Sequence, residues 1–208
     1  MSTSNGTKHH DETEVTFKLS RLERQTFVVP IRGTSPLIVN RWSEKAKEMM
    51  LQAQQTKARA KKDPKDPILN FEASKYRLAD GRDGFPSTAF KAAIVHASRL
   101  FEGITQVLVK QTVLVIGEGH EQLVPLDYGE VTMREDTPRN ASGVADLRYR
   151  AQYWPWAVDL HVRCIGGQFD ISSIMSLVDA AGIGGVGEWR PTSPKSATGT
   201  FGTFEVVG

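Results

Sequence analysis

The sequence has 208 residues, of which 39% are hydrophobic and 24% charged, and its formal net charge is +2. These values are ordinary for a globular protein and exclude a bulk polycation, so any nucleic-acid contact must depend on a local arrangement of basic residues. No apolar run approaches the roughly 20 residues of a membrane helix, and the polar start of the chain is not a secretory signal. We expect a soluble cytoplasmic protein with a mobile tail over 1–24 and one domain over 25–208. The lone cysteine, Cys164, fits a reducing compartment and is expected in the core.

The first half of the domain contains one predicted strand and two predicted helices. Residues 25–32 have the composition of a strand, and Pro30 indicates an edge position or a bulge there. A helix is expected over 43–62 and ends at a pair of Asp-Pro sequences. The clearest helical pattern covers 87–101, where apolar residues share one face and Gly103 supplies the stop.

The second half begins with β-rich runs. Residues 106–116 form a long run that is apolar on both faces and is predicted to be a strand, and 122–127 is a shorter one. The segment 131–153 has no regular pattern and is expected to be irregular. Residues 157–165 alternate between apolar and polar types, which predicts another strand.

The last elements complete a recognisable order. Asp170 or Ser172 is positioned to cap a second amphipathic helix, and a final strand is expected over 200–207. Without its insertions, at 36–84 and 121–155, the chain reads β–α–β–β–α–β. This is the order of the α+β ferredoxin-like unit, which RRM domains share, with two helices on one face of a four-stranded antiparallel sheet.

The most distinctive segment is rich in glycine and runs from Gly182 to Gly202. Gly182, Gly184 and Gly187 spell G-x-G-x-x-G, but a dinucleotide-binding motif follows a strand and opens a helix, whereas this one follows a predicted helix. The Gly-Lys-Ser/Thr sequence of a P-loop is absent. We therefore expect no enzyme active site here and no catalytic residue, cofactor or metal.

A glycine-rich loop is suited to contact with a nucleic-acid backbone. Glycine allows a close approach to phosphate, and successive free N–H groups form an anion-binding nest. We predict that Gly184 and Gly185 contact the backbone, that Arg190 and Lys195 add charge, and that Trp189 offers a stacking surface. The alternative is a flexible hairpin between the last helix and the last strand.

A second candidate contact region lies in the insertion over 121–155. Single strands are held by basic grooves and by aromatic side chains that stack on bases, each worth roughly 1–3 kcal/mol. The basic members, all expected to bind nucleic acid, are Arg134, Arg139, Arg148 and Arg150, and the aromatic ones are Tyr149, Tyr153, Trp154 and Trp156. In the alternative, Trp154 and Trp156 fill the core and the arginines pair with acids of the same insertion, namely Glu130, Glu135, Asp136 and Asp146.

The first insertion adds two smaller basic groups to the predicted interface. Arg41 and Trp42 are adjacent, and Lys45 follows them closely. Lys57 and Arg59, with the two lysines that follow, form a basic arm that we expect to become ordered on a nucleic-acid strand. A solvated helix end is the alternative for this arm.

The order of elements resembles the RAMP superfamily, the ferredoxin-like RNA-binding proteins of CRISPR systems. The β–α–β–β–α–β order carries the resemblance, together with the insertion between the middle strands, where backbone subunits of CRISPR effector complexes carry a thumb. The third feature is the glycine-rich loop before the last strand, which ends in Gly199-Thr-Phe-Gly202-Thr-Phe204. The sequence departs from RAMP nucleases in lacking a clear catalytic histidine in the first insertion.

The chain also resembles uncharacterised phage and prophage proteins of similar length, over nearly all of the sequence past residue 25. The stretches that carry this resemblance are Ser35-Pro36-Leu37-Ile38, Arg41-Trp42-Ser43-Glu44-Lys45-Ala46, Met133-Arg134-Glu135-Asp136 and Gly187-Glu188-Trp189-Arg190-Pro191.

These resemblances imply a non-enzymatic protein that binds single-stranded nucleic acid. The leading hypothesis is single-stranded DNA binding in phage replication or recombination, in the host cytoplasm, with protomers side by side along the strand as a homo-oligomer or filament and with no membrane partner. The alternatives are a CRISPR-type subunit that holds a guide RNA and a phage structural or assembly protein. A metal-dependent nuclease needs several converging carboxylates, for which Asp136 and Asp146 are the candidates.

Overall fold

The computed structural model describes residues 18–42, 48, 51, 66–137, 145–194 and 197–208. The expected tail over 1–24 and the expected helix over 43–62 lie largely outside these residues. Several predicted contact residues also lie outside the described part, namely Lys45, Lys57, Arg59, Arg139 and Lys195. The described chain is a mixed α+β structure with four α-helices and antiparallel sheets.

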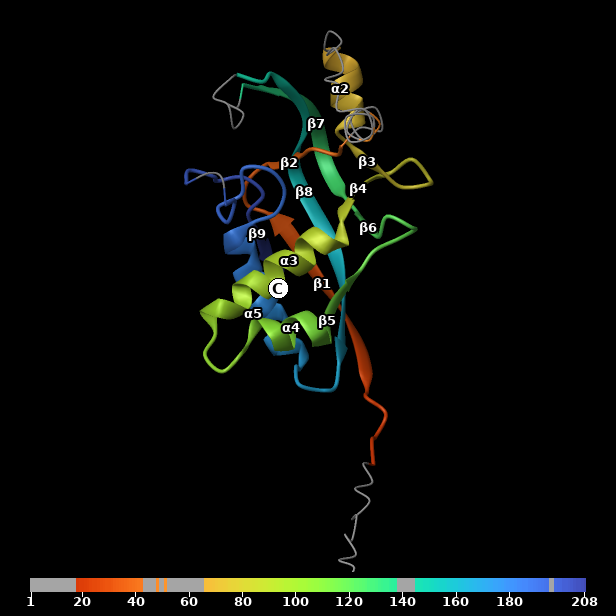
Figure 1. Cartoon of the computed structure of the whole chain (residues 1–208), viewed down its shortest axis with the longest axis vertical. Coiled ribbons are helices and arrows are strands. Elements are labelled where there is room, and N and C mark those ends of the chain that lie inside the picture. Colours follow the sequence, from red (N-terminus) through yellow and green to blue (C-terminus); the bar gives the residue numbers. More distant parts are fainter. Residues whose placement is uncertain (1–17, 43–47, 49–50, 52–65, 138–144, 195–196) are drawn as a thin grey trace, which may run out of the picture.

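A six-stranded antiparallel sheet forms the centre of the molecule, and its longest strand is β8 (Arg148–Ile165). The C-terminal half of β8 lies between β1 and β5, and β9 pairs with the other side of β1, which gives the order β9-β1-β8-β5. The N-terminal half of β8 lies between β2 and β7 (Figure 1). The strands around β8 are β1 (Arg24–Gly33), β2 (Leu37–Val39), β5 (Val113–Ile116), β7 (Asp127–Asp136) and β9 (Phe204–Val206).

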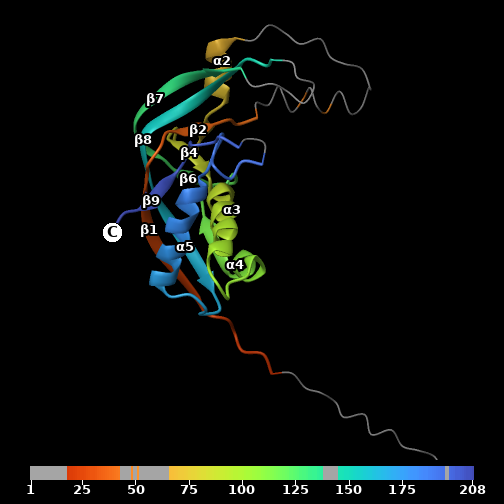
Figure 2. The ribbon, with the colours of Figure 1, turned by 90° about the vertical axis from the view of Figure 1, so that its left-hand side faces the viewer.

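Helices cover one face of this sheet. The helices α3 (Ser87–Ala97), α4 (Gln106–Thr112) and α5 (Ile171–Gly184) all lie on the same side of β1 and β8, and no described helix lies on the opposite side (Figure 2). A short 3-10 helix over Ser98–Leu100 follows α3. The core between the layers is apolar because alternate residues of the strands meet the apolar faces of α3 and α5. Its fully buried members include Val29, Leu160, Val162, Phe90, Ile94, Ile174 and Leu177.

A smaller sheet lies beside the base of β7. It contains β3 (Tyr76–Arg77), β4 (Asp83–Pro86) and β6 (Leu123–Pro125), in that order. The helix α2 (Pro67–Ala73) precedes it, with Asp66 accepting a hydrogen bond from the Leu69 N–H at 3.0 Å. We call β7 and the part of β8 that pairs with it, 148–157, the arm. The arm projects from the connection between β5 and the C-terminal half of β8.

Several predicted elements are confirmed. The strand expected over 25–32 is β1. Among the described residues, β9 pairs only with Ile31–Gly33 and leaves the rest of β1 as an edge, one of the two positions that Pro30 indicated. The helix expected over 87–101 is α3 with its 3-10 extension. Asp170 caps α5 by accepting from the Ser173 N–H at 2.8 Å. Cys164 lies in the core, where burial raises its thiol pKa to about 11.

Two predictions are wrong. The run 106–116 is not one strand, because 106–112 form α4, capped by Thr105, and only 113–116 are extended. An apolar run of this length fits a buried helix turn as well as a strand. The segment 131–153 is not irregular, because most of its described residues belong to the two strands of the arm. The two strands are stabilised by pairing with each other. Their charged and aromatic residues show no clear alternation of apolar and polar types in the sequence.

Candidate nucleic-acid interface

The glycine-rich segment begins inside α5 and packs closely against its own fold. A Cβ on Gly182 would collide with the Phe204 carbonyl, and one on Gly202 would collide with the Val186 carbonyl. Gly185 ends the helix at φ 67°, a left-handed conformation that favours glycine, and its N–H donates to the Ala181 carbonyl at 3.0 Å. The glycines are therefore required, first of all, by close approaches of backbone to backbone.

The N–H groups of this segment are mostly used within the protein. Val186 donates to the Gly202 carbonyl and Glu188 to the Ile38 carbonyl, each at 2.9 Å, and Phe201 donates to the Trp189 carbonyl at 3.1 Å. The prediction of a nest of successive free N–H groups is therefore wrong for Gly185, Val186 and Glu188. Contact of Gly184 and Gly185 with nucleic acid stays a prediction.

The arm and the glycine-rich segment meet at a cluster of charges. Arg134 donates from Nε to Asp136 at 2.9 Å and from Nη1 to Gln152 at 3.1 Å, and its guanidinium lies 4.7 Å from the centre of the Phe201 ring. The contact with Phe201 joins two regions that the sequence singled out separately. We call Arg134, Asp136, Arg150, Glu188 and Phe201 the junction.

Arg150 is the buried member of the junction. Its side chain is 1% exposed, and its Nη1 lies 3.6 Å from Asp136 and 3.9 Å from Glu188. Burial lowers the pKa of its guanidinium, and the nearby Glu188 carboxylate opposes that shift. Neither Nε nor Nη1 has a hydrogen-bond partner among the described residues. This arginine holds the arm to the loop and is not open to a ligand in this arrangement.

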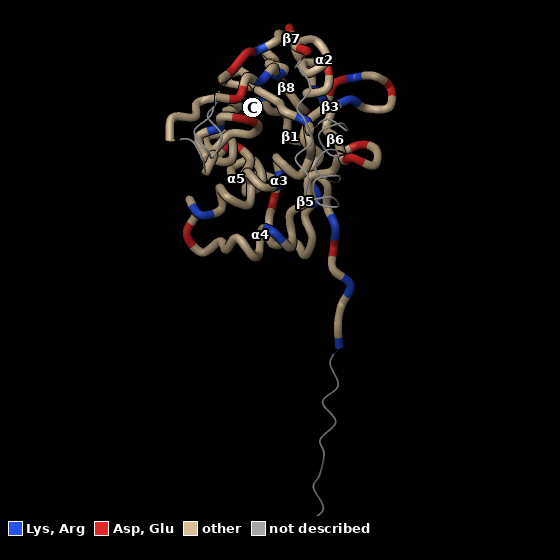
Figure 3. The backbone as a smooth tube through the Cα atoms, turned by 45° about the horizontal axis from the view of Figure 1, so that its top comes forward, with Lys and Arg blue, Asp and Glu red and all other residues tan. Residues whose placement is uncertain are grey.

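Two more of the predicted arginines, Arg148 and Arg41, also have acidic partners. Arg148 lies 3.1 Å from Asp146, and Arg41 lies 2.6 Å from Glu121. The alternative interpretation of the insertion is thus confirmed for Asp136 and Asp146. Figure 3 shows the same intermingling of acidic and basic residues around the arm and α2.

The tryptophans divide into core and surface. Trp156 is buried, and its Nε1 donates to the Ser35 carbonyl at 2.8 Å. Trp42 and Trp154 are 53% and 43% exposed, so they are available for stacking. Trp189 is half-buried, and its left-handed backbone, with φ of 58°, turns the glycine-rich segment.

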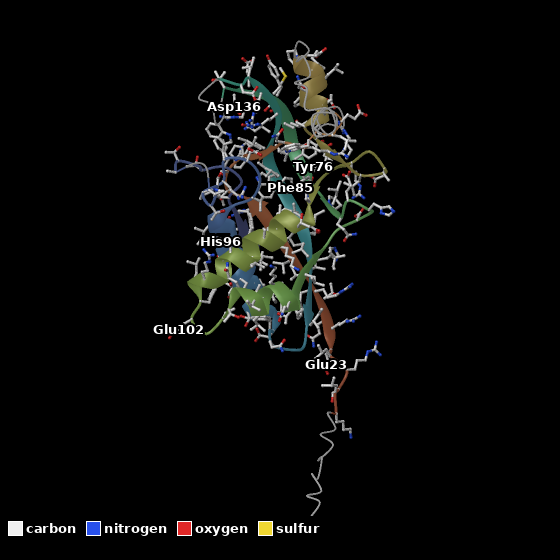
Figure 4. The ribbon with its side chains drawn as sticks, viewed as in Figure 1. Glu23, Tyr76, Phe85, His96, Glu102 and Asp136 are labelled. Atoms are coloured by element: carbon white, nitrogen blue, oxygen red, sulfur yellow. The ribbon has the colours of Figure 1, made fainter. Side chains whose placement is uncertain are left out.

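A cleft of about 440 Å³ lies between α3 and the glycine-rich segment. Tyr76 and Phe85 form one wall, with their rings edge to face at 5.9 Å, and Figure 4 shows them beyond the start of α3, with His96 further along that helix. Arg190 lies at the cleft, and its Nη1 donates to the Gly187 carbonyl at 2.8 Å. The polar side chains that line it are Asn40, Tyr76, Thr88, His96, Glu188, Arg190 and Thr192.

A buried hydrogen-bonded group fixes the wall of this cleft to the arm. Asp83 of β4 is 3% exposed, accepts a hydrogen bond from the Tyr128 hydroxyl at 3.0 Å and pairs with Arg77 at 2.9 Å. Burial, with Asp83 nearby, raises the pKa of Tyr153 far above its ordinary value, so this tyrosine stays neutral. The small sheet that carries Tyr76 is therefore anchored to β7.

Sequence reasoning found Arg190 but missed most of the cleft. Asn40, Tyr76 and Thr88 come from separate segments, and no short motif joins them. The structure also places His96, which is exposed, at the cleft. The nearest sequence signal for the cleft was the amphipathic pattern of α3, which indicates which side of that helix is polar.

No protein-family model matches this sequence, and no curated protein is significantly similar to it. Among the described residues, no group of three or more His, Cys, Asp or Glu side chains is arranged to hold a metal ion. None of the described helices has the length and apolar character needed to cross a membrane. The geometry is therefore the basis for a functional proposal.

Proposed function

We propose that this chain is a non-catalytic protein that binds single-stranded nucleic acid in the cleft between α3 and the glycine-rich segment. The observation that carries the proposal is the convergence of that segment, α3 and the small sheet of β3, β4 and β6 on one cleft. It offers the half-buried ring of Tyr76, hydrogen-bonding groups at Asn40 and Thr88, and a cation at Arg190. Phe85, which is 5% exposed, supports the Tyr76 ring from the core. Aromatic and cationic groups along one groove are what single strands need for stacking and phosphate contact.

The strand order supports the resemblance to RAMP proteins. The order β9-β1-β8-β5, with α3 and α5 on one face, supports the assignment of a ferredoxin-like sheet. The arm belongs to the connection between β5 and the C-terminal half of β8, which are the second and third strands of that unit along the chain. CRISPR backbone subunits carry their thumb at this connection. Fold analogy alone does not establish a ligand, so the site must carry the proposal.

The paired charges limit how strongly phosphate is held. Arg134 and Arg41 each have a carboxylate within 3 Å, so a phosphate must displace that carboxylate or share the guanidinium with it. We expect moderate affinity and the release of few counterions. For single strands the salt slope is about −0.7 per phosphate contacted, so a shallow slope is expected.

The test is fluorescence anisotropy with labelled oligonucleotides, in single-stranded and duplex DNA and RNA, at low and high salt. We expect single strands to bind more tightly than duplexes and to weaken as salt rises. No binding to any single strand at low salt would sink the proposal. A marked RNA preference, with RNA of defined length purifying with the protein, would favour the guide-RNA subunit over a DNA-binding protein.

A further inference from the structure

The lower part of β1 is an open sheet edge. β8 pairs with β1 from Arg24 to Arg32, whereas β9 pairs only with Ile31–Gly33 on the other side. The Val207 N–H donates to the Pro30 carbonyl at 2.9 Å, so Pro30 turns its polar backbone atoms away from β8. Backbone groups alternate in direction along an antiparallel strand, so Arg24, Thr26 and Val28 also point theirs away from β8. Within the described residues, no strand meets these groups.

Between Arg24 and Pro30, this edge lacks the features by which proteins usually protect exposed strands. Natural edges are blunted by charges, proline, bulges or short length. Residues 25–29 are Gln-Thr-Phe-Val-Val, uncharged, without proline or glycine, and mostly of types that favour strands. The Val28 side chain is 54% exposed. Glu23 marks this free end of β1, far from Asp136 and the cleft (Figure 4).

We propose that this edge binds β1 of a second copy of the chain in an antiparallel pair, so that one continuous sheet runs through a two-fold dimer. A strand related to itself by a two-fold axis satisfies its own open groups without a second kind of surface. The proposal goes beyond nucleic-acid binding and does not depend on it.

The contact between Val207 and Pro30 also limits the register of the pair. The Pro30 carbonyl is already occupied by Val207, so the added strand must stop opposite Val28. The register centred on Thr26 uses the whole open edge, and it places Arg24 of each copy opposite Val28 of the other. A register centred on Arg24 would set two like charges opposite each other, which destabilises a strand pair.

Two substitutions break the edge without removing its ladder with β8. In Thr26→Pro, the lost N–H is one that points away from β8, and Pro30 shows that proline is accepted at an equivalent position of the same strand. In Val28→Lys, a charge is added on an exposed side chain, the usual protection of natural edges. Thr26→Val keeps the N–H and the β-branched shape, so it is the matched control.

The experiment is sedimentation velocity of the full chain from low to high micromolar concentration, without nucleic acid. We expect a dimer for the unmodified chain and Thr26→Val, and monomers for Thr26→Pro and Val28→Lys with unchanged circular dichroism. Hydrogen exchange adds a residue-level readout, in which the Thr26 and Val28 amides become protected as concentration rises. A chain that stays monomeric throughout overturns the proposal. So does association of Val28→Lys in which the amides of residues 26 and 28 stay unprotected. Failure here leaves single-strand binding untouched, because that is measured on oligonucleotides at the cleft.

Discussion

Two regions of the molecule are held by different forces. The first is the half of the sheet that carries α3 and α5, and the second is the junction between the arm and the glycine-rich segment. In the first, the buried residues are apolar side chains such as Leu160, Ile174 and Leu177. In the second, a fully buried arginine sits among carboxylates, and glycines let backbones touch. Apolar packing contains no titratable group and so does not depend directly on pH, whereas buried charges depend on every partner that remains. The junction is therefore where a small chemical change should alter both stability and ligand contact.

The largest expected effect is in the apolar half. We expect Leu177→Ala to lower the free energy of unfolding by about 3 kcal/mol, because it removes a fully buried side chain and leaves a cavity. Urea unfolding at neutral and mildly acidic pH measures it. The loss should be the same at both pH values, and a strong pH dependence would contradict the apolar assignment.

Glycine substitution at the loop should come next. We expect Gly202→Ala to cost about 3 kcal/mol, because the new Cβ meets the Val186 carbonyl and the backbone has φ of 68°. Gly103→Ala is the matched control, with φ of 77° but open space around its Cβ, and should cost only about 1 kcal/mol. Thermal unfolding of both variants separates collision from backbone strain. Equal losses would show that the close approach is not what requires glycine.

Removing one charge of the junction should have an intermediate effect. We expect Asp136→Asn to lower the free energy of unfolding by about 2 kcal/mol, because Arg150 keeps only Glu188, 3.9 Å away, as an acidic partner. The control is Glu205→Gln, which breaks an exposed pair with Arg32 and should cost below about 1 kcal/mol. Denaturant titration compares them, and a loss for Asp136→Asn no larger than the control would refute the buried-charge description.

The smallest effect concerns the cap of α5. The Ser173 N–H donates to Asp170 and lowers the pKa of that carboxyl below its ordinary 3.8. A depressed folded pKa means that the carboxylate stabilises the fold above that ordinary value and loses this contribution as pH falls through the folded pKa. We expect Asp170→Asn to be slightly less stable than the unmodified chain at neutral pH and equal to it in strong acid. Melting temperatures across that range decide it, and a gap that widens in acid would reverse the assigned sign.

The elements that depend on interactions within a few residues could be predicted from the sequence. The spacing of apolar residues in α3 and the cap of α5 act within a few residues, so the sequence alone located α3 and limited the cap to Asp170 or Ser172. The arm was missed because its strands are fixed by pairing with each other, as in Arg134 opposite Arg150, and not by a pattern within either strand. The glycine-rich segment was located correctly, but its glycines serve packing contacts with Ile38 and Phe204 that no local pattern reveals. The cleft was missed for the same reason, since its lining comes from segments far apart in sequence.

The central claim, that single strands bind in the cleft, is tested most directly by two opposite substitutions at its rim. Glu188 and Arg190 both line the cleft, so Glu188→Gln removes repulsion from phosphate and Arg190→Gln removes attraction. We expect single-strand affinity to rise with the first and fall with the second, each by roughly fivefold, the scale of one partly exposed charge contact. Glu102→Gln, which Figure 4 shows at the far end of the molecule from the arm, is the control and should change nothing. Anisotropy at low salt measures all three. Equal affinities for Glu188→Gln, Arg190→Gln and the control, with binding intact, would place the strand elsewhere and contradict the claim.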